Sequence, residues 1–123
     1  MRNLLLVGVG GFIGAVFRYK ISGLILHHTM NWKFPAGTFF VNSFGCLATG
    51  VLMALAVKQD LFSPNTRLLL FTGILGGFTT FSAFGLETIY LIQRHEILWA
   101  GLYVILTVSV GLLALWIGLS TVQ

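Results

Sequence analysis

Hydrophobic residues fill four long stretches of this chain, and short polar or proline-containing segments separate them. The stretches have similar lengths and cover about residues 3–26, 36–57, 66–92 and 98–120. Each is long enough for the roughly 20 apolar residues that a helix needs to cross a bilayer. The pattern predicts an all-α membrane protein with four transmembrane helices, built as a single domain over residues 1–123.

Composition supports a membrane protein and excludes other classes. Of the 123 residues, 57% are hydrophobic and 8% are charged, whereas soluble domains have about 25% charged residues. The seven basic residues are scattered over helix ends and form no patch, so we expect no nucleic-acid binding. Cys46 is the only cysteine, which predicts no disulfide and an apolar packing role. All three histidines are predicted in loops, so no buried serine has a base and we expect no enzyme.

The third stretch contains polar residues where an apolar span is expected. The run from Gly73 to Phe84 holds three glycines and three hydroxyl residues. No water is available in the bilayer core to satisfy loosened backbone groups, so a weak helix there needs protein, an ion or a water-filled path. We predict that the third helix is broken mid-membrane. The freed carbonyls, such as those of Gly76 and Thr79, would suit a monovalent cation; a kink without an ion is the alternative.

Polar side chains in the second and fourth stretches share helix faces. Thr38 and Asn42 lie on one face of the second stretch, and Tyr103 and Thr107 on one face of the fourth. The amide of Asn42 has two donor hydrogens that hydrocarbon cannot satisfy. We expect Asn42 to face an anion pathway, or alternatively to join two helices by a hydrogen bond. The hydroxyls of Tyr103 and Thr107 would extend a hydrogen-bonding track.

Two phenylalanines just past the predicted break share a face with hydroxyl residues nearby. Phe81 and Phe84 are three residues apart, and Thr80 and Ser82 supply hydroxyl donors. The edge of a phenyl ring is electropositive, so it can meet an anion without a formal charge. Such pairs are otherwise core or lipid-facing residues.

Arg18 and Glu87 are the ionisable residues expected at membrane depth, where unpaired charges are costly. We expect Arg18 to draw anions toward a vestibule. Glu87 would cap a helix, pair with a basic residue or line the back of a pathway, and we favour a structural role.

Basic residues are nearly balanced between the two predicted sides of the membrane. Arg2, Lys58 and Arg67 lie on one side, and Lys33 and Arg94 on the other. Lysine and arginine bias normally sets orientation, so this balance predicts insertion both ways and an antiparallel homodimer. In the first stretch, the spacing of Gly10, Gly11 and Gly14 allows helix backbones to approach closely, for assembly or for plain helix packing.

Three segments together resemble the signature segments of the CrcB/Fluc family of fluoride channels. They are Gly10-Gly-Phe-Ile-Gly-Ala-Val-Phe-Arg-Tyr19, Gly37-Thr-Phe-Phe-Val-Asn-Ser-Phe-Gly45 and Gly73-Ile-Leu-Gly-Gly-Phe-Thr-Thr-Phe-Ser-Ala-Phe84. The resemblance implies a dual-topology antiparallel homodimer in the cytoplasmic (inner) membrane of a bacterium. It also implies two pores that export fluoride passively and so give fluoride resistance.

The resemblance also implies roles for particular residues. Asn42 matches a pore asparagine, Phe81 and Phe84 match phenylalanines whose ring edges contact fluoride, and Arg18 matches an arginine near the vestibule. The carbonyls of Gly76 and Thr79, from both subunits, match those that bind a structural sodium ion. The remaining matches are pathway hydroxyls: Thr80, Ser82, Tyr103 and Thr107.

Two other functions fit a small four-span protein. A proton-coupled multidrug exporter needs a carboxylate inside the membrane, and Glu87 would have to serve because the first stretch has none. An assembly subunit without transport would use Asn42 and the glycines only to pack helices.

Overall fold

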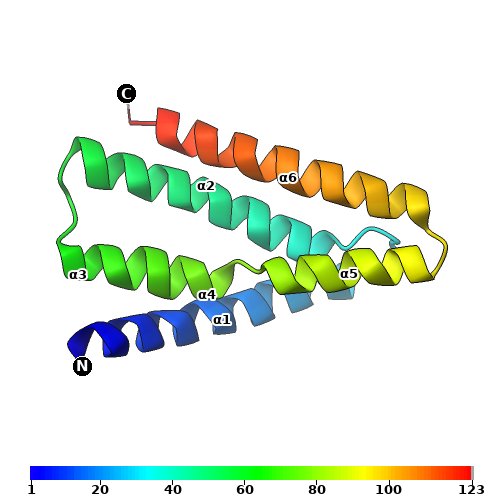
Figure 1. The fold of residues 1–123 in the computed structure, drawn as a ribbon, viewed down its shortest axis with the longest axis horizontal. Coiled ribbons are helices and arrows are strands. Elements are labelled where there is room, and N and C mark those ends of the chain that lie inside the picture. The colour runs from blue at the N-terminus through cyan, green and yellow to red at the C-terminus, as the bar shows by residue number, and fades with distance from the viewer. Residues whose placement is uncertain (123) are drawn as a thin grey trace.

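Residues 1–122 form a helical protein in the computed structural model, and Figure 1 shows the arrangement. Three long helices are α1 (Arg2–His28), α2 (Ala36–Lys58) and α6 (Ile97–Ser120). The span between α2 and α6 consists of α3 (Pro64–Arg67), the π-helical segment η1 (Leu68–Leu75), α4 (Gly76–Phe78) and α5 (Phe81–Gln93). Within the described residues there is no strand, and four helical stretches are long and apolar enough to cross a membrane. The prediction of an all-α protein with four such spans is confirmed.

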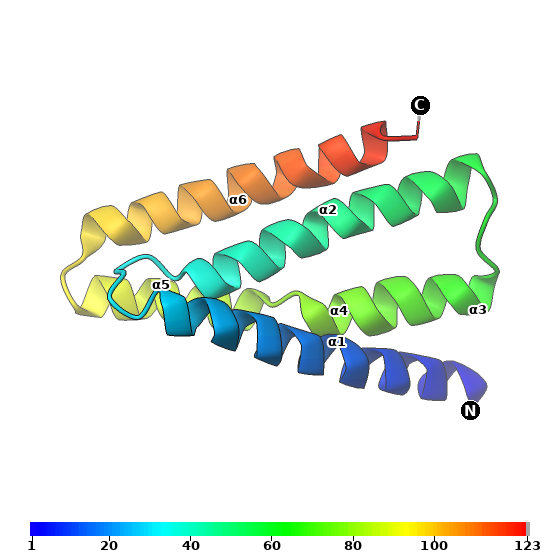
Figure 2. The same cartoon turned by 180° about the vertical axis from the view of Figure 1, so that it is seen from behind.

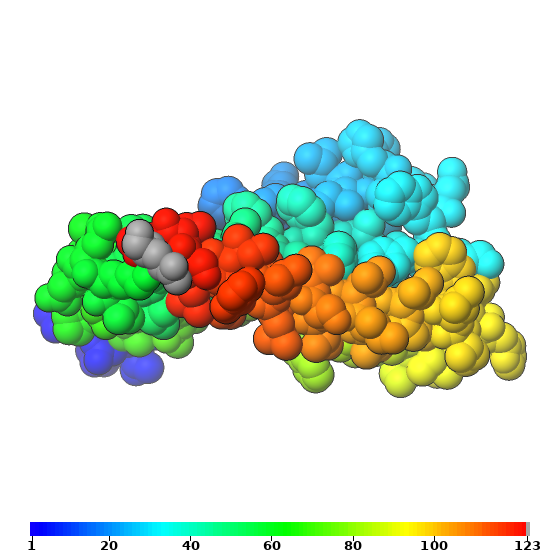
Figure 3. Space-filling model, turned by 90° about the horizontal axis from the view of Figure 1, so that it is seen from above, coloured from blue at the N-terminus to red at the C-terminus, as the bar shows by residue number. Residues whose placement is uncertain are grey.

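The helices pack side by side along their lengths. α2 lies between α6 and the span from α3 to α5, while α1 packs against η1 and α4 (Figures 1 and 2). α2 and α6 run in the same direction, and both chain ends lie at the end of the molecule where α3 begins (Figure 1). Seen from above, α6, coloured orange to red, lies on the surface of the molecule along its length (Figure 3). Most large apolar side chains are exposed in the single chain, as expected where lipid or another chain covers them.

Glycines bring α1 into backbone contact with the third span. A Cβ added to Gly10 would lie 2.8 Å from the Cα of Gly73, and one added to Gly14 would overlap the carbonyl oxygen of Ile74. Small residues at helix contacts allow this approach. Gly10 and Gly14 therefore serve helix packing within the chain.

A second glycine contact joins the parallel helices α2 and α6. A Cβ on Gly118 would lie 3.0 Å from the Cα of Gly50, and one on Gly111 would lie 3.5 Å from the sulfur of Cys46. The thiol of Cys46 is free and fills the space beside Gly111. These contacts fix which turns of α2 and α6 lie opposite each other.

The third span is interrupted at Thr79 and Thr80, and the two halves continue with only a slight bend (Figure 1). Thr79 has φ −82° and ψ 155°, and Thr80 has φ −149° and ψ 122°, both extended. The hydroxyl of Thr80 accepts a hydrogen bond from the backbone N–H of Ala83 at 3.2 Å, so Thr80 caps the start of α5. Gly76 and Gly77 stay helical. The residues with extended backbone are therefore the two threonines and not the glycines.

Polar contacts tie the connecting segments at both ends of the molecule. The ammonium of Lys33 lies 2.6 Å from the carboxylate of Glu96, which joins the segment before α2 to the start of α6. Arg67 donates a hydrogen bond of 2.6 Å to the carbonyl of Ala56. His27 and His28 belong to the last turn of α1, so the expectation that all histidines lie in loops was wrong for these two.

Candidate functional site

Asn42 of α2 holds the extended backbone of Thr80. Its amide nitrogen donates to the carbonyl oxygen of Thr80, and its amide oxygen accepts from the N–H of Thr80, both at 2.8 Å. The N–H of Thr80 is a backbone group that the interruption removes from the helix, and burying it unpaired would be costly. A side-chain amide has two N–H donors. One is used here, so the other is available for a ligand.

Arg18 of α1 is bound to α4, the short helix just before the interruption. Its Nε donates to the carbonyl oxygen of Gly77 at 3.1 Å, and the side chain is half-buried. A cation near a helix C-terminus interacts favourably with the helix dipole and satisfies a free carbonyl. The remaining guanidinium donors can still attract an anion. The structure thus places Arg18 beside the end of α4.

Two backbone carbonyls at the interruption are free of hydrogen bonds from the described part of the chain. In an unbroken helix, the N–H of Thr80 would bond to the carbonyl of Gly76, but here it donates to Asn42. No hydrogen bond within residues 1–122 ends on the carbonyl oxygen of Gly76 or Thr79. These two oxygens are the groups with which the interruption could bind a cation.

Aromatic rings continue from the interruption toward α6. The ring centroids of Phe81 and Phe84 are 5.6 Å apart, and those of Phe84 and Tyr103 are 5.2 Å apart. Phe81 is 82% exposed in the single chain, and Ser82 beside it is also exposed. The hydroxyls of Thr80 and Ser82 are 3.4 Å apart. Phe81 and Ser82 therefore face outward, whereas Phe84 packs against the core cluster that contains Tyr103.

Glu87 joins three helices through its two carboxylate oxygens. The hydroxyl of Thr38 donates to Oε1 and that of Tyr103 donates to Oε2, each at 2.7 Å. Tyr103 is fully buried, so this carboxylate fixes the position of a core side chain. Sequence reasoning singled out all three residues but did not join them. The only signal was that each is a polar residue in an otherwise apolar span.

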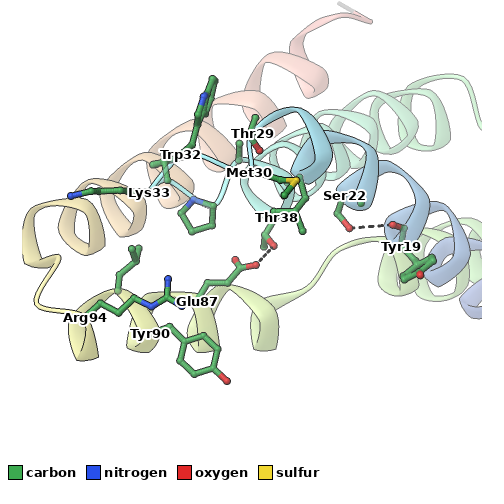
Figure 4. A pocket seen from close by; sticks show the side chains of 17 residues that line it. Tyr19, Ser22, Thr29, Met30, Trp32, Lys33, Thr38, Glu87, Tyr90 and Arg94 are labelled. Carbon is green, nitrogen blue, oxygen red and sulfur yellow. Dashed lines mark hydrogen bonds between the residues drawn. The ribbon is translucent and has the colours of Figure 1, made fainter.

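A cavity of about 470 Å³ reaches this carboxylate from the end of the molecule where α1 ends. Figure 4 shows Glu87 turned toward Thr38, with Arg94 two turns further along α5. Lys33 and Arg94 both line the cavity. Lys33 is paired with the carboxylate of Glu96, and Glu87 also lines the cavity, so its lining carries charges of both signs.

The structure brings together most of the residues predicted for the site. Asn42 is bonded to Thr80, and Phe84 contacts Tyr103. Thr107 lies one turn beyond Tyr103 on α6, and its hydroxyl oxygen is buried without a partner among the residues that the structure describes. Ser43 has the same property and was not singled out from the sequence.

The fold and the site together define a multi-pass membrane protein with an interrupted third span, where polar groups and ring edges meet without a cluster of acidic residues. Among the described residues, no group of three or more His, Cys, Asp or Glu could hold a metal. The chain belongs to the CrcB family: the model described as "CrcB-like protein, Camphor Resistance (CrcB)" matches residues 5–119. The resemblance found in the three sequence segments is confirmed.

Curated relatives extend over nearly the whole chain. A protein of Methylobacillus flagellatus named "Fluoride-specific ion channel FluC" is 46% identical over 123 residues, covering 100% of this chain and 96% of that protein. A protein of Hyphomonas neptunium with the same name is 47% identical, covering 97% and 94%. One of Methanosarcina acetivorans, "Fluoride-specific ion channel FluC 1", is 41% identical, covering 96% and 88%. The relatives are ion channels, which confirms the prediction that the chain is not an enzyme.

Proposed function

We propose that this protein is a fluoride-selective passive channel that exports fluoride across the cytoplasmic (inner) membrane of a bacterium and lowers its toxicity. The names of the relatives support fluoride as the ion. The observation that carries the proposal is the pair of hydrogen bonds between Asn42 and Thr80. This pair holds the interruption open and leaves a spare amide donor next to Thr80, the residue before Phe81.

The chemistry of the site suits a small, strongly hydrated anion. Fluoride is a strong hydrogen-bond acceptor, so replacing its water requires several donors close together. The donors here are the spare N–H of Asn42, the hydroxyls of Thr80 and Ser82, and the ring edges of Phe81 and Phe84. Because none is a formal charge, binding is weak enough for the ion to leave. The pathway would continue toward Tyr103 and Thr107.

We further propose that two copies assemble antiparallel and form two pores. The exposure of Phe81 at 82% supports this, because a pathway residue needs a covering wall that the single chain does not supply. The near balance of basic residues supports insertion in both orientations.

A structural sodium ion fits the free carbonyls at the interruption. The residues that would hold it are Gly76 and Thr79, through their backbone oxygens, from each of the two copies. Carbonyl oxygens are suitable ligands for a hard monovalent cation, and these two receive no hydrogen bond within residues 1–122. When bound, the ion would supply positive charge that holds the two interruptions together.

The proposal is tested by efflux from liposomes that contain only the purified protein. Fluoride release is followed with a fluoride-sensitive electrode under a potassium ionophore, with chloride release measured in parallel. Fast fluoride release with little chloride release is expected. If folded protein releases neither ion, the channel proposal fails and an assembly role takes its place.

Replacing Phe81 with isoleucine is expected to lower fluoride efflux by at least about tenfold, which is a change of about 1.4 kcal/mol in the barrier. The lost feature is the ring edge, and little packing changes because Phe81 is 82% exposed in the single chain. Efflux is measured at equal protein per liposome. Phe12→Ile is the matched control, since Phe12 is 71% exposed on α1 and is not one of the proposed pathway residues. Equal efflux in both variants would remove Phe81 from the pathway.

Replacing Glu87 with glutamine is expected to leave fluoride efflux within about threefold of the original, equivalent to less than about 0.7 kcal/mol. Glutamine keeps an oxygen acceptor for one hydroxyl, and an amide can hydrogen-bond the other. The measurement also decides between a channel and a proton-coupled exporter, because an exporter needs the carboxylate to take up and release protons. Loss of transport in Glu87→Gln, with Phe81→Ile still active, would favour the exporter.

A further inference from the structure

Two buried hydroxyls in the membrane-spanning part of this chain have no hydrogen-bond partner within residues 1–122. The oxygens of Ser43 on α2 and Thr107 on α6 are enclosed by protein, and no donor or acceptor among residues 1–122 reaches them. Burying an unpaired hydroxyl is costly, and such groups in a folded protein normally have a partner. A small bound partner is therefore expected beside these two oxygens.

Several other hydroxyls in this chain are satisfied within their own helix. Hydroxyls that donate to the carbonyl four residues earlier, at 2.7–2.9 Å, belong to Thr29, Thr49, Thr79, Thr88 and Ser120. Ser43 and Thr107 lie inside regular helices with the same backbone geometry. Their side chains are not in this arrangement. Both hydroxyls are therefore free to bind something outside their own helix.

The packing of α2 against α6 places the two hydroxyls at the same level. The helices run in the same direction, and Cys46 of α2 meets Gly111 of α6. One turn earlier on each helix lie Ser43 and Thr107. One turn earlier again, Phe39 packs against the core cluster that contains Tyr103. Contacts on both sides thus place Ser43 opposite Thr107 in the interface between the two helices.

We propose that Ser43 and Thr107 form a site for one small hydrogen-bond acceptor between α2 and α6. Two hydroxyl donors without a formal charge suit fluoride or a water molecule, which accept hydrogen bonds in the same way. The fluoride case rests on the proposed channel function. In that case Ser43 supplies a hydrogen-bond donor from α2 beside the pathway residue Thr107 of α6. The neighbouring hydroxyl on α6, that of Tyr103, already donates to Glu87.

A high-resolution crystal structure of the unmodified protein in fluoride-containing buffer tests the site itself. The expected result is a non-protein density peak within hydrogen-bonding distance of both Ser43 Oγ and Thr107 Oγ1. If there is no peak and both hydroxyls turn back to the carbonyls of their own helices, the proposal is overturned. Fluoride and water have the same number of electrons and give similar density peaks. The occupant therefore has to be identified by measuring fluoride efflux.

Fluoride efflux from liposomes separates the two occupants. If the site binds the permeating ion, Ser43→Ala lowers efflux by about fivefold, the effect of losing one hydrogen bond, and Ser43→Thr restores it. Thr49→Ala is the control on the same helix, because that hydroxyl is already bonded to the carbonyl of Gly45. A peak with unchanged efflux in Ser43→Ala identifies a structural water at the same site. A peak in a protein that releases no fluoride leaves the site standing and refutes only the channel proposal.

Discussion

Replacing Asn42 with alanine is expected to remove the proposed fluoride release and to destabilise the folded chain by about 1–3 kcal/mol, because the N–H of Thr80 would lose its hydrogen-bond partner. The N–H and the carbonyl of Thr80 are each bonded to Asn42 at 2.8 Å, and the carbonyl, at the N-cap of α5, also accepts the first hydrogen bond of that helix. Lipid cannot replace the lost partner. The midpoint of unfolding in detergent and efflux from liposomes measure the two effects separately.

A second substitution at the same position separates anchoring from conduction. Asn42→Asp keeps an acceptor for the N–H of Thr80 but loses the donor and adds a negative charge. We expect it to retain part of the stability and to block fluoride release by repulsion. Thr49→Ala, further along α2, is the control for any change in this helix. Wild-type stability in Asn42→Ala would show that the interruption does not depend on this amide.

Replacing Gly14 with valine is expected to prevent α1 from packing on the third span, with a loss of more than about 3 kcal/mol, the upper end for overpacking. An added Cβ would overlap the carbonyl oxygen of Ile74 and lie 2.8 Å from the backbone nitrogen of Phe78. Both are backbone atoms in helices, so neither can rotate away. Low yield of monodisperse protein and a lower unfolding midpoint would report the effect.

The matched control for this substitution lies on the same helix. Gly8→Val places the same side chain on α1 where a Cβ meets no atom within 4 Å. We expect yield and unfolding midpoint close to those of the original protein. If both variants give the same yield and unfolding midpoint, the contact between Gly14 and the third span does not determine the effect of valine in α1.

The sequence indicates an interruption in the third span but not the residues that form it. Glycines in the run from Gly73 to Phe84 suggested weak helix, yet Gly73 and Gly77 stay helical and pack against α1. Thr79 and Thr80 are extended instead. β-branched residues favour extended backbone, and threonine can also cap the next helix. Whether a glycine loosens a helix or allows close packing depends on its neighbour in space, which the sequence does not reveal.

The same limit applies to the polar side chains. Helical spacing puts Thr38 and Asn42 on one face of α2, but their partners are 49 and 38 positions away in the chain. Glu87 is therefore assigned to Thr38 and Tyr103 only by the folded structure. Ser43 gave no signal, because a serine beside an asparagine in a helix fits many roles. Its unusual feature is that its buried hydroxyl has no hydrogen-bond partner in the part of the chain that the structure describes.

The interruption has a consequence for how the chain enters the membrane during synthesis. The span Pro64–Gln93 has 30 residues, but α5 has only 13 of them, fewer than the roughly 20 that cross a bilayer. Neither half can insert alone, and the extended threonines between them carry backbone groups that lipid does not satisfy. Their partner Asn42 lies earlier in the chain, so it is synthesised before the third span. The order of the helices along the gene thus provides the third span with its partner at the moment of insertion.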